Sequence, residues 1–173
     1  FERNGAWNGG AVYAEGTPTY ISDSSFTSNG YDAPTTAAYG SGLYVKNGSC
    51  SLLRASFDSN WSGDRGVVNL EGSDVHISET SITRNTAWTD PGIYTGGGAL
   101  RMVNCVVADN ATRSPGEQSE LVLNGAAVLI HNTIARNPGA GGCKGVTLGW
   151  DVPYTLRDNI IVGHTTGVAN WSY

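Results

Sequence analysis

The sequence has little charge and very little lysine. Only two of its 173 residues are lysine, Lys46 and Lys144, and charged residues make up 14% of the chain against about 25% in ordinary domains. This composition excludes helical bundles, coiled coils and charged disordered tails, which are rich in lysine, glutamate and leucine. No apolar run approaches the roughly 18 residues that cross a bilayer. Acidic residues outnumber basic ones by 15 to 10, which argues against nucleic-acid binding.

Cysteine is also scarce, and the chain has no motif for a cofactor. Cys50, Cys105 and Cys143 are widely spaced, so neither a disulfide framework nor a structural zinc site is predicted, and we expect small core residues. The residues from Phe1 to Asn4 do not resemble a signal peptide. Metal ligands are not predicted either. Calcium is compatible with the composition, but no motif indicates it.

Glycine is abundant, with 24 residues, and the whole chain is a repeat. An apolar residue followed three positions later by asparagine recurs at 25- to 31-residue intervals. Another apolar residue lies five positions earlier. The two apolar columns are Phe26, Phe57, Ile82, Val107, Ile134, Ile161 and Ile21, Leu52, Ile77, Met102, Leu129, Leu156. A third column, Val12, Leu43, Val68 and Ile93, follows a glycine in each coil.

Each repeat is too short to fold alone, and its segments alternate apolar and polar residues with the period of a strand. Parallel stacking of such coils buries the columns, and the strong right-handed preference of parallel connections predicts an all-β, right-handed parallel β-helix. We expect one domain over residues 1–173 with about six coils. Their expected bounds are 5–29, 30–60, 61–85, 86–110, 111–137 and 138–164.

Two polar columns have structural interpretations. The asparagines from Asn4 to Asn137 are expected at a turn with left-handed backbone angles, with their amides stacked from coil to coil. His164 replaces asparagine in the last coil. A charged column is expected to form outward salt bridges; its members are Asp23, Arg54, Glu79, Asn104, His131 and Asp158. A small column that begins at Ser24 is expected to face inward.

Both ends of the sequence fall within a coil. We therefore expect a fragment of a longer solenoid, or a unit whose exposed strand edges are covered by other copies of itself. Either arrangement makes the rest of a longer chain or a second copy the expected partner.

The repeats resemble a known family. Gly9-Gly-Ala-Val-Tyr13, Leu129-Ile-His-Asn-Thr-Ile-Ala-Arg-Asn137 and Leu156-Arg-Asp-Asn-Ile-Ile-Val-Gly-His164 are similar to repeats of bacterial right-handed parallel β-helix proteins. That group comprises pectin-lyase-like and polymorphic outer-membrane-protein-type proteins. The resemblance covers essentially the whole chain. It implies a secreted or cell-surface location, and a role as an adhesin, a passenger domain or a polysaccharide-active enzyme.

The motifs of the polysaccharide-active relatives are missing, so no catalytic residue is predicted. The segments that follow the asparagine column vary in length and are expected to emerge as loops along one edge of the solenoid, where aromatic and charged residues suit glycans or a protein partner. The candidates are Trp7, Tyr31, Tyr39, Trp61, Asp64, Arg65, Trp88, Asp90 and Tyr94.

Three functions remain open from the sequence. The leading hypothesis is a non-enzymatic structural or adhesive β-helix outside the cell, which presents a rigid surface and stacks end to end into a filament. The alternatives are an enzyme that cleaves acidic glycans, which requires carboxylates and a base from neighbouring coils to converge, and a glycan-binding module without catalysis.

Overall fold

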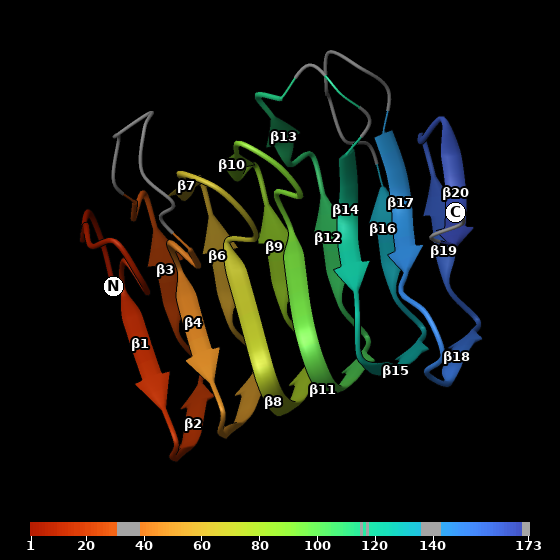
Figure 1. Cartoon of the computed structure of the whole chain (residues 1–173). Helices are drawn as coiled ribbons and strands as arrows, with labels where there is room; N and C mark the ends of the chain where they lie inside the picture. Colours follow the sequence, from red (N-terminus) through yellow and green to blue (C-terminus); the bar gives the residue numbers. More distant parts are fainter. Residues whose placement is uncertain (31–38, 115, 117, 136–142, 171–173) are drawn as a thin grey trace.

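The structure is a computed structural model that describes residues 1–30, 39–114, 116, 118–135 and 143–170. The described residues form strands and turns without a helix (Figure 1). The largest sheet follows the order β1, β4, β8, β11, β14, β17, β20, with bounds Val12–Glu15, Leu43–Lys46, Val68–Ser78, Ile93–Val103, Gln118–Leu123, Cys143–Leu148 and Thr166–Asn170. Off this path lie β2 (Pro18–Ser22), β5 (Ser49–Leu53), β15 (Ala126–Ile130) and β18 (Tyr154–Arg157).

The second sheet is built from three-residue strands, and a third is smaller still. The second comprises β3 (Ser25–Thr27), β6 (Ser56–Asp58), β9 (Ser81–Thr83), β12 (Val106–Ala108), β16 (Thr133–Ala135) and β19 (Ile160–Val162). The third comprises β7 (Trp61–Ser62), β10 (Thr86–Ala87) and β13 (Ala111–Thr112). These two-residue strands occupy the edge that the sequence assigned to loops, because Trp61, Thr86 and Ala111 are in register and pair in parallel.

The chain winds as the expected parallel β-helix. Each recorded strand pair is parallel, and the partner of each strand lies one coil away in the sequence. Six strands stack from β3 to β19 and are joined by five turns of the chain, which agrees with the fold expected from about six coils. The N- and C-terminal coils lie at opposite ends of the stack (Figure 1).

The apolar columns form the core, as the repeat predicts. Phe26, Phe57 and Ile82 are directly paired and fully buried, and the rings of the two phenylalanines stack with centroids 4.3 Å apart. The third column continues beyond Ile93 through Leu121 and Val146. Only the end coils leave such positions partly exposed, since each lacks one neighbouring coil.

The asparagine column lies inside the core rather than on a turn surface. Asn29, Asn60, Asn85 and Asn110 are at most 1% exposed. The backbone N–H and side-chain amide of Asn29, Asn60 and Asn85 each donate to the Oδ1 atom of the asparagine one coil later, at 2.8–3.0 Å. The stacked amides are therefore confirmed.

The left-handed backbone is not in the asparagines, so that part of the prediction was wrong. It belongs to the residue before each of them, such as Ser28, Ser59 and Arg84, with φ from 54° to 56°. This preceding residue turns the chain so that the asparagine side chain enters the core. Its own side chain points outward, which is why many residue types are found there.

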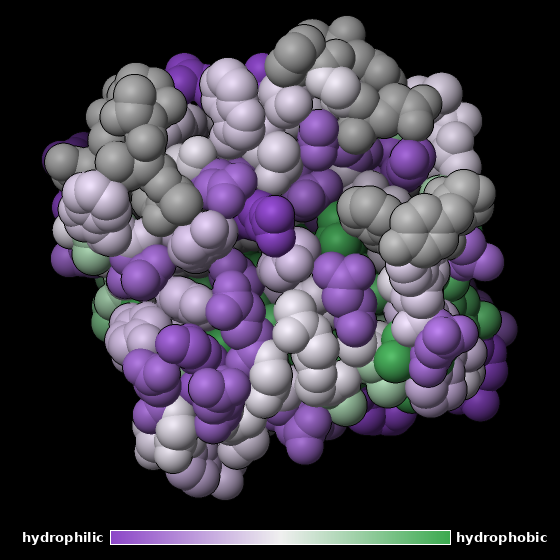
Figure 2. Space-filling view, in the orientation of Figure 1, coloured by the Kyte–Doolittle hydropathy of each residue, from purple (hydrophilic) through white to green (hydrophobic). Residues whose placement is uncertain are grey.

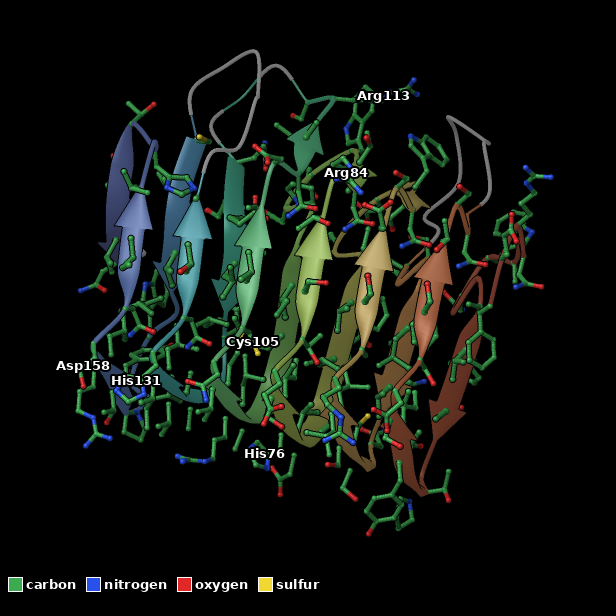
Figure 3. The ribbon with its side chains drawn as sticks, turned by 180° about the vertical axis from the view of Figure 1, so that it is seen from behind. His76, Arg84, Cys105, Arg113, His131 and Asp158 are labelled. Carbon is green, nitrogen blue, oxygen red and sulfur yellow. The ribbon has the colours of Figure 1, made fainter. Side chains whose placement is uncertain are left out.

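The charged column has the same backbone role at the opposite corner. Each member, from Asp23 to Asp158, has φ between 49° and 55°. Arg54 pairs with Asp23 (Nε–Oδ1, 2.6 Å), and His131 with Asp158 (3.1 Å), as Figure 3 shows for the second pair. The following residues face inward as predicted. Two of them form a second asparagine ladder, in which Asn132 donates to Asn159 at 3.0 Å.

Glu120 ends the described asparagine ladder. Glu120 directly precedes Leu121 and is aligned with Gly92 and Gly145 in the neighbouring coils. Those coils have no side chain at this position, whereas Glu120 places a carboxyl group there. It is fully buried and accepts a hydrogen bond from the Asn110 amide, while its second oxygen has no partner among the described residues. Burial raises the pKa of Glu120 to about 8, so the neutral acid is favoured at neutral pH.

The three cysteines are buried, in agreement with their expected role as small core residues. Burial raises the pKa of Cys50 to about 11, so its thiol stays protonated and unreactive at neutral pH. Across the described ranges, no helix is long and apolar enough to cross a membrane.

Asn69 is a buried polar side chain whose amide is not satisfied. It lies between Tyr44 and Tyr94 on the outward row of the large sheet, is fully buried, and has no hydrogen-bond partner for either side-chain atom in the described structure. Replacing it with a branched apolar residue removes this desolvation cost. We expect Asn69→Val to raise the free energy of unfolding in urea by about 1–3 kcal/mol.

A matched control lies on the same outward row. The Thr147 hydroxyl is 2.6 Å from the Ser119 hydroxyl, so Thr147→Val breaks a satisfied pair and is expected to lower the free energy of unfolding. A loss of stability in Asn69→Val similar to that in Thr147→Val would show that Asn69 is satisfied in solution.

Candidate functional site

A groove lies on the outer face of the large sheet and crosses four consecutive coils. Its volume is about 540 Å³. Figure 2 shows this face hollowed near its middle, with hydrophobic atoms visible between hydrophilic side chains. Because neighbouring coils are about 4.8 Å apart, four coils give the groove a length of about 15 Å. The lining residues are Asp64, Arg65, Thr89, Asp90, Tyr94, Gln118, Val122, Asn124, Gly149 and Trp150.

One wall carries two carboxylates from successive coils. Asp64 precedes β8 and Asp90 precedes β11, and a backbone hydrogen bond from Thr89 N–H to the Asp64 carbonyl (2.8 Å) joins the two segments. The Asp90 backbone has φ of 37°, an uncommon conformation that a non-glycine residue adopts at a cost. Its Oδ1 atom accepts a hydrogen bond from the Ser119 N–H at 3.1 Å.

The two carboxylates differ in environment. Burial raises the pKa of Asp90 to about 6, and the nearby Asp64 charge adds to the rise, whereas the Ser119 N–H and Arg65 oppose it. Asp64 lies near Tyr39, whose pKa is raised by burial and by the Asp64 charge. Asp90 therefore titrates close to neutral pH and can exchange a proton there.

Aromatic side chains complete the groove. Tyr94 lies in β11, and Arg65 donates from Nη1 to its hydroxyl at 2.9 Å while the guanidinium carbon lies 4.8 Å from the ring centroid. Trp150, just after β17, is 43% exposed, and Val122 lies in β14. The groove thus combines flat apolar faces with hydrogen-bonding groups, the mixture that sugar rings require.

The structure brings together four of the residues nominated from the sequence. Asp64, Arg65, Asp90 and Tyr94 line the groove, and Tyr39 contacts Asp64 at its margin. Trp7 and Trp88 are exposed but do not line it. Tyr31 lies outside the described residues.

Trp61 lines a different hollow. This second hollow has a volume of about 260 Å³ and includes Arg113, whose guanidinium carbon lies 5.4 Å from the Trp61 ring. Both residues lie at the edge formed by β7 and β13, and Figure 3 shows Arg113 at that edge.

The far wall of the groove was missed by the sequence analysis. Asn124 and Trp150 follow the strands that contain Leu121 and Val146, which continue the third apolar column. Extending that column past Ile93 would have placed both residues just after their strands, because β14 pairs with β17 through Leu121 and Val146 and this register aligns Asn124 with Gly149, the residue before Trp150. The irregular segments before these strands concealed the register.

The groove offers no clustered metal ligands. Within the described part of the chain, no group of three or more histidine, cysteine, aspartate or glutamate side chains could hold a metal ion.

Comparison with known families gave one match. The family model described as a right handed beta helix region matches residues 1–161. Comparison with curated proteins and with solved structures gave no match. The fold supports a structural or polysaccharide-related role.

Proposed function

Because the chain belongs to the right-handed β-helix family, we propose that it is a non-enzymatic adhesive β-helix that binds a glycan chain in the groove beside Trp150. The observation that supports this proposal is the combination of Trp150 and Tyr94 with the polar residues of four coils in one groove. The stacked coils form a stiff scaffold, so these groups are held in position before a ligand arrives. An extracellular or cell-surface location, and contact with other copies of the chain, belong to the same proposal.

Removal of the groove tryptophan tests glycan binding. We expect Trp150→Ala to weaken binding of the best ligand in a panel of neutral, acidic and amino oligosaccharides by about tenfold or more, since an aromatic anchor contributes more than about 1 kcal/mol. Isothermal titration calorimetry measures the change. Trp88→Ala is the matched control, because Trp88 is similarly exposed (47%) and lies outside the groove. Equal loss in both variants, or no binding by the unmodified protein, would contradict the proposal.

A second candidate function is hydrolysis of a glycan. It is favoured by the two carboxylates of the groove, since a glycosidase needs one carboxyl group that retains its proton and a second that is ionised. Asp90, with its raised pKa, would supply the proton and Asp64 the carboxylate. Release of reducing ends from bound oligosaccharides, lost in Asp90→Asn, distinguishes this function from binding alone.

A further inference from the structure

The groove carries more negative than positive charge. Among the described residues that line it, Asp64 and Asp90 are acidic, Arg65 is basic and the others are uncharged. The whole chain has a formal net charge of −5, so the surroundings do not supply a general positive potential. A uronic acid chain would therefore meet repulsion from two carboxylates on one wall.

The Arg65 side chain makes its contacts within the groove wall. Its guanidinium packs on the Tyr94 ring and donates to the hydroxyl of the same residue. A ligand carboxylate would have to compete with these contacts. These contacts hold the side chain along the groove wall, and its single positive charge faces the charges of Asp64 and Asp90 in the same groove.

The two carboxylates keep free capacity to accept hydrogen bonds. Asp90 accepts from the Ser119 N–H at 3.1 Å, and Asp64 lies near Tyr39. An ionised carboxylate offers about four acceptor positions, so both can accept N–H donors from a ligand in the groove. An ammonium group has three donors and a full charge, and it is also attracted to aromatic faces such as those of Tyr94 and Trp150.

From this charge arrangement we infer that the groove prefers a glycan with protonated amino groups, a hexosamine oligomer, over a neutral oligomer and over a uronic acid oligomer. This inference rests on the proposed glycan binding and reverses the acidic-glycan substrate suggested by the sequence. The sugar rings contact the aromatic side chains, and the amino groups lie against Asp64 and Asp90.

Three oligosaccharides of equal length test this preference. A glucosamine hexamer, an N-acetylglucosamine hexamer and a galacturonic acid hexamer are titrated into the protein at low salt and about pH 6. The amino group of glucosamine is less basic than that of lysine, because neighbouring oxygens withdraw electrons from it, so a slightly acidic pH is needed to protonate it. We expect the glucosamine hexamer to bind about tenfold more tightly than the N-acetylated one, and the galacturonic acid hexamer to bind most weakly. Added salt should weaken binding of the glucosamine hexamer and leave binding of the N-acetylated hexamer nearly unchanged.

A charge-removing variant assigns the preference to the groove. Asp64→Asn should weaken binding of the glucosamine hexamer much more than binding of the N-acetylated hexamer, so that most of the preference is lost. Glu79→Gln is the control, since it changes the net charge equally at an exposed position outside the groove. Retention of the full preference in Asp64→Asn would overturn the inference.

The outcomes separate the inference from the proposed function. Binding of the N-acetylated hexamer without any gain from free amino groups overturns the charge preference and leaves glycan binding intact. Tightest binding of the galacturonic acid hexamer also overturns the preference. Failure of all three hexamers to bind contradicts glycan binding itself, and the inference with it.

Discussion

Asn85→Ala is expected to lower the free energy of unfolding by about 4 kcal/mol, one of the largest effects available in this chain. The Asn85 amide donates to the Phe57 carbonyl (3.0 Å) and to Asn110 Oδ1 (2.9 Å). Its own Oδ1 atom accepts from the Asn60 N–H and side-chain amide. All these groups are buried, so the substitution leaves several of them without partners and without access to water. Urea denaturation followed by circular dichroism measures the change.

The same substitution at the start of the ladder is the control. The Asn4 side chain donates one hydrogen bond to Asn29 and lies in the partly buried first coil, so Asn4→Ala is expected to cost about 1 kcal/mol or less. If Asn85→Ala is no more costly than Asn4→Ala, the internal amides contribute little and the apolar columns alone stabilise the stack.

Glu120→Gln is expected to stabilise the protein increasingly as the pH rises. The pKa of Glu120 is raised to about 8 in the folded state, whereas an unfolded glutamate titrates near 4.3. Between these values the folded protein keeps a proton that the unfolded chain releases, so folding stability falls with increasing pH by up to about 1.4 kcal/mol per unit. The amide cannot ionise, so the variant lacks this dependence.

The measurement is the difference in free energy of unfolding between Glu120→Gln and the unmodified protein. It should rise by about 3 kcal/mol between about pH 5 and about pH 8, in favour of the variant. Any constant effect of the altered hydrogen bond with Asn110 cancels in this comparison, and so does the titration of Asp90. Parallel stability curves would mean that Glu120 is ionised in the folded protein, with water or a cation beside it.

The sequence predicted the core because side chains in a β-helix repeat with the coil. Phe26, Phe57 and Ile82 occupy one column in the sequence and one stack in the structure. The stacked amides could be predicted for the same reason. The left-handed residues could not, since Ser28, Arg54 and Glu79 share no side-chain property: their positions require a backbone angle that several residue types tolerate at a cost.

Only some of the residues that line the groove could be predicted from the sequence. Asp64 and Asp90 precede strands of the regular repeat, and their shared wall follows from the register. Trp150 and Asn124 follow strands whose preceding segments are irregular, so their alignment with the earlier coils depends on the pairing of β14 with β17. The raised pKa of Asp90 depends on its burial among segments of several coils, which no spacing of residues in one coil reveals.

The asparagine ladder also bears on how such a chain changes length during evolution. Every described rung presents donors to the next coil and an acceptor to the previous one, and successive asparagines from Asn60 to Asn110 are 25 residues apart. Duplication of one such segment adds an asparagine that can form the same hydrogen bonds with its new neighbours. Deletion of one segment brings together two asparagines that can hydrogen bond to each other. Gene segments that encode whole coils can therefore be gained or lost without redesign of the interior, while a change of a few residues is tolerated only between the strands.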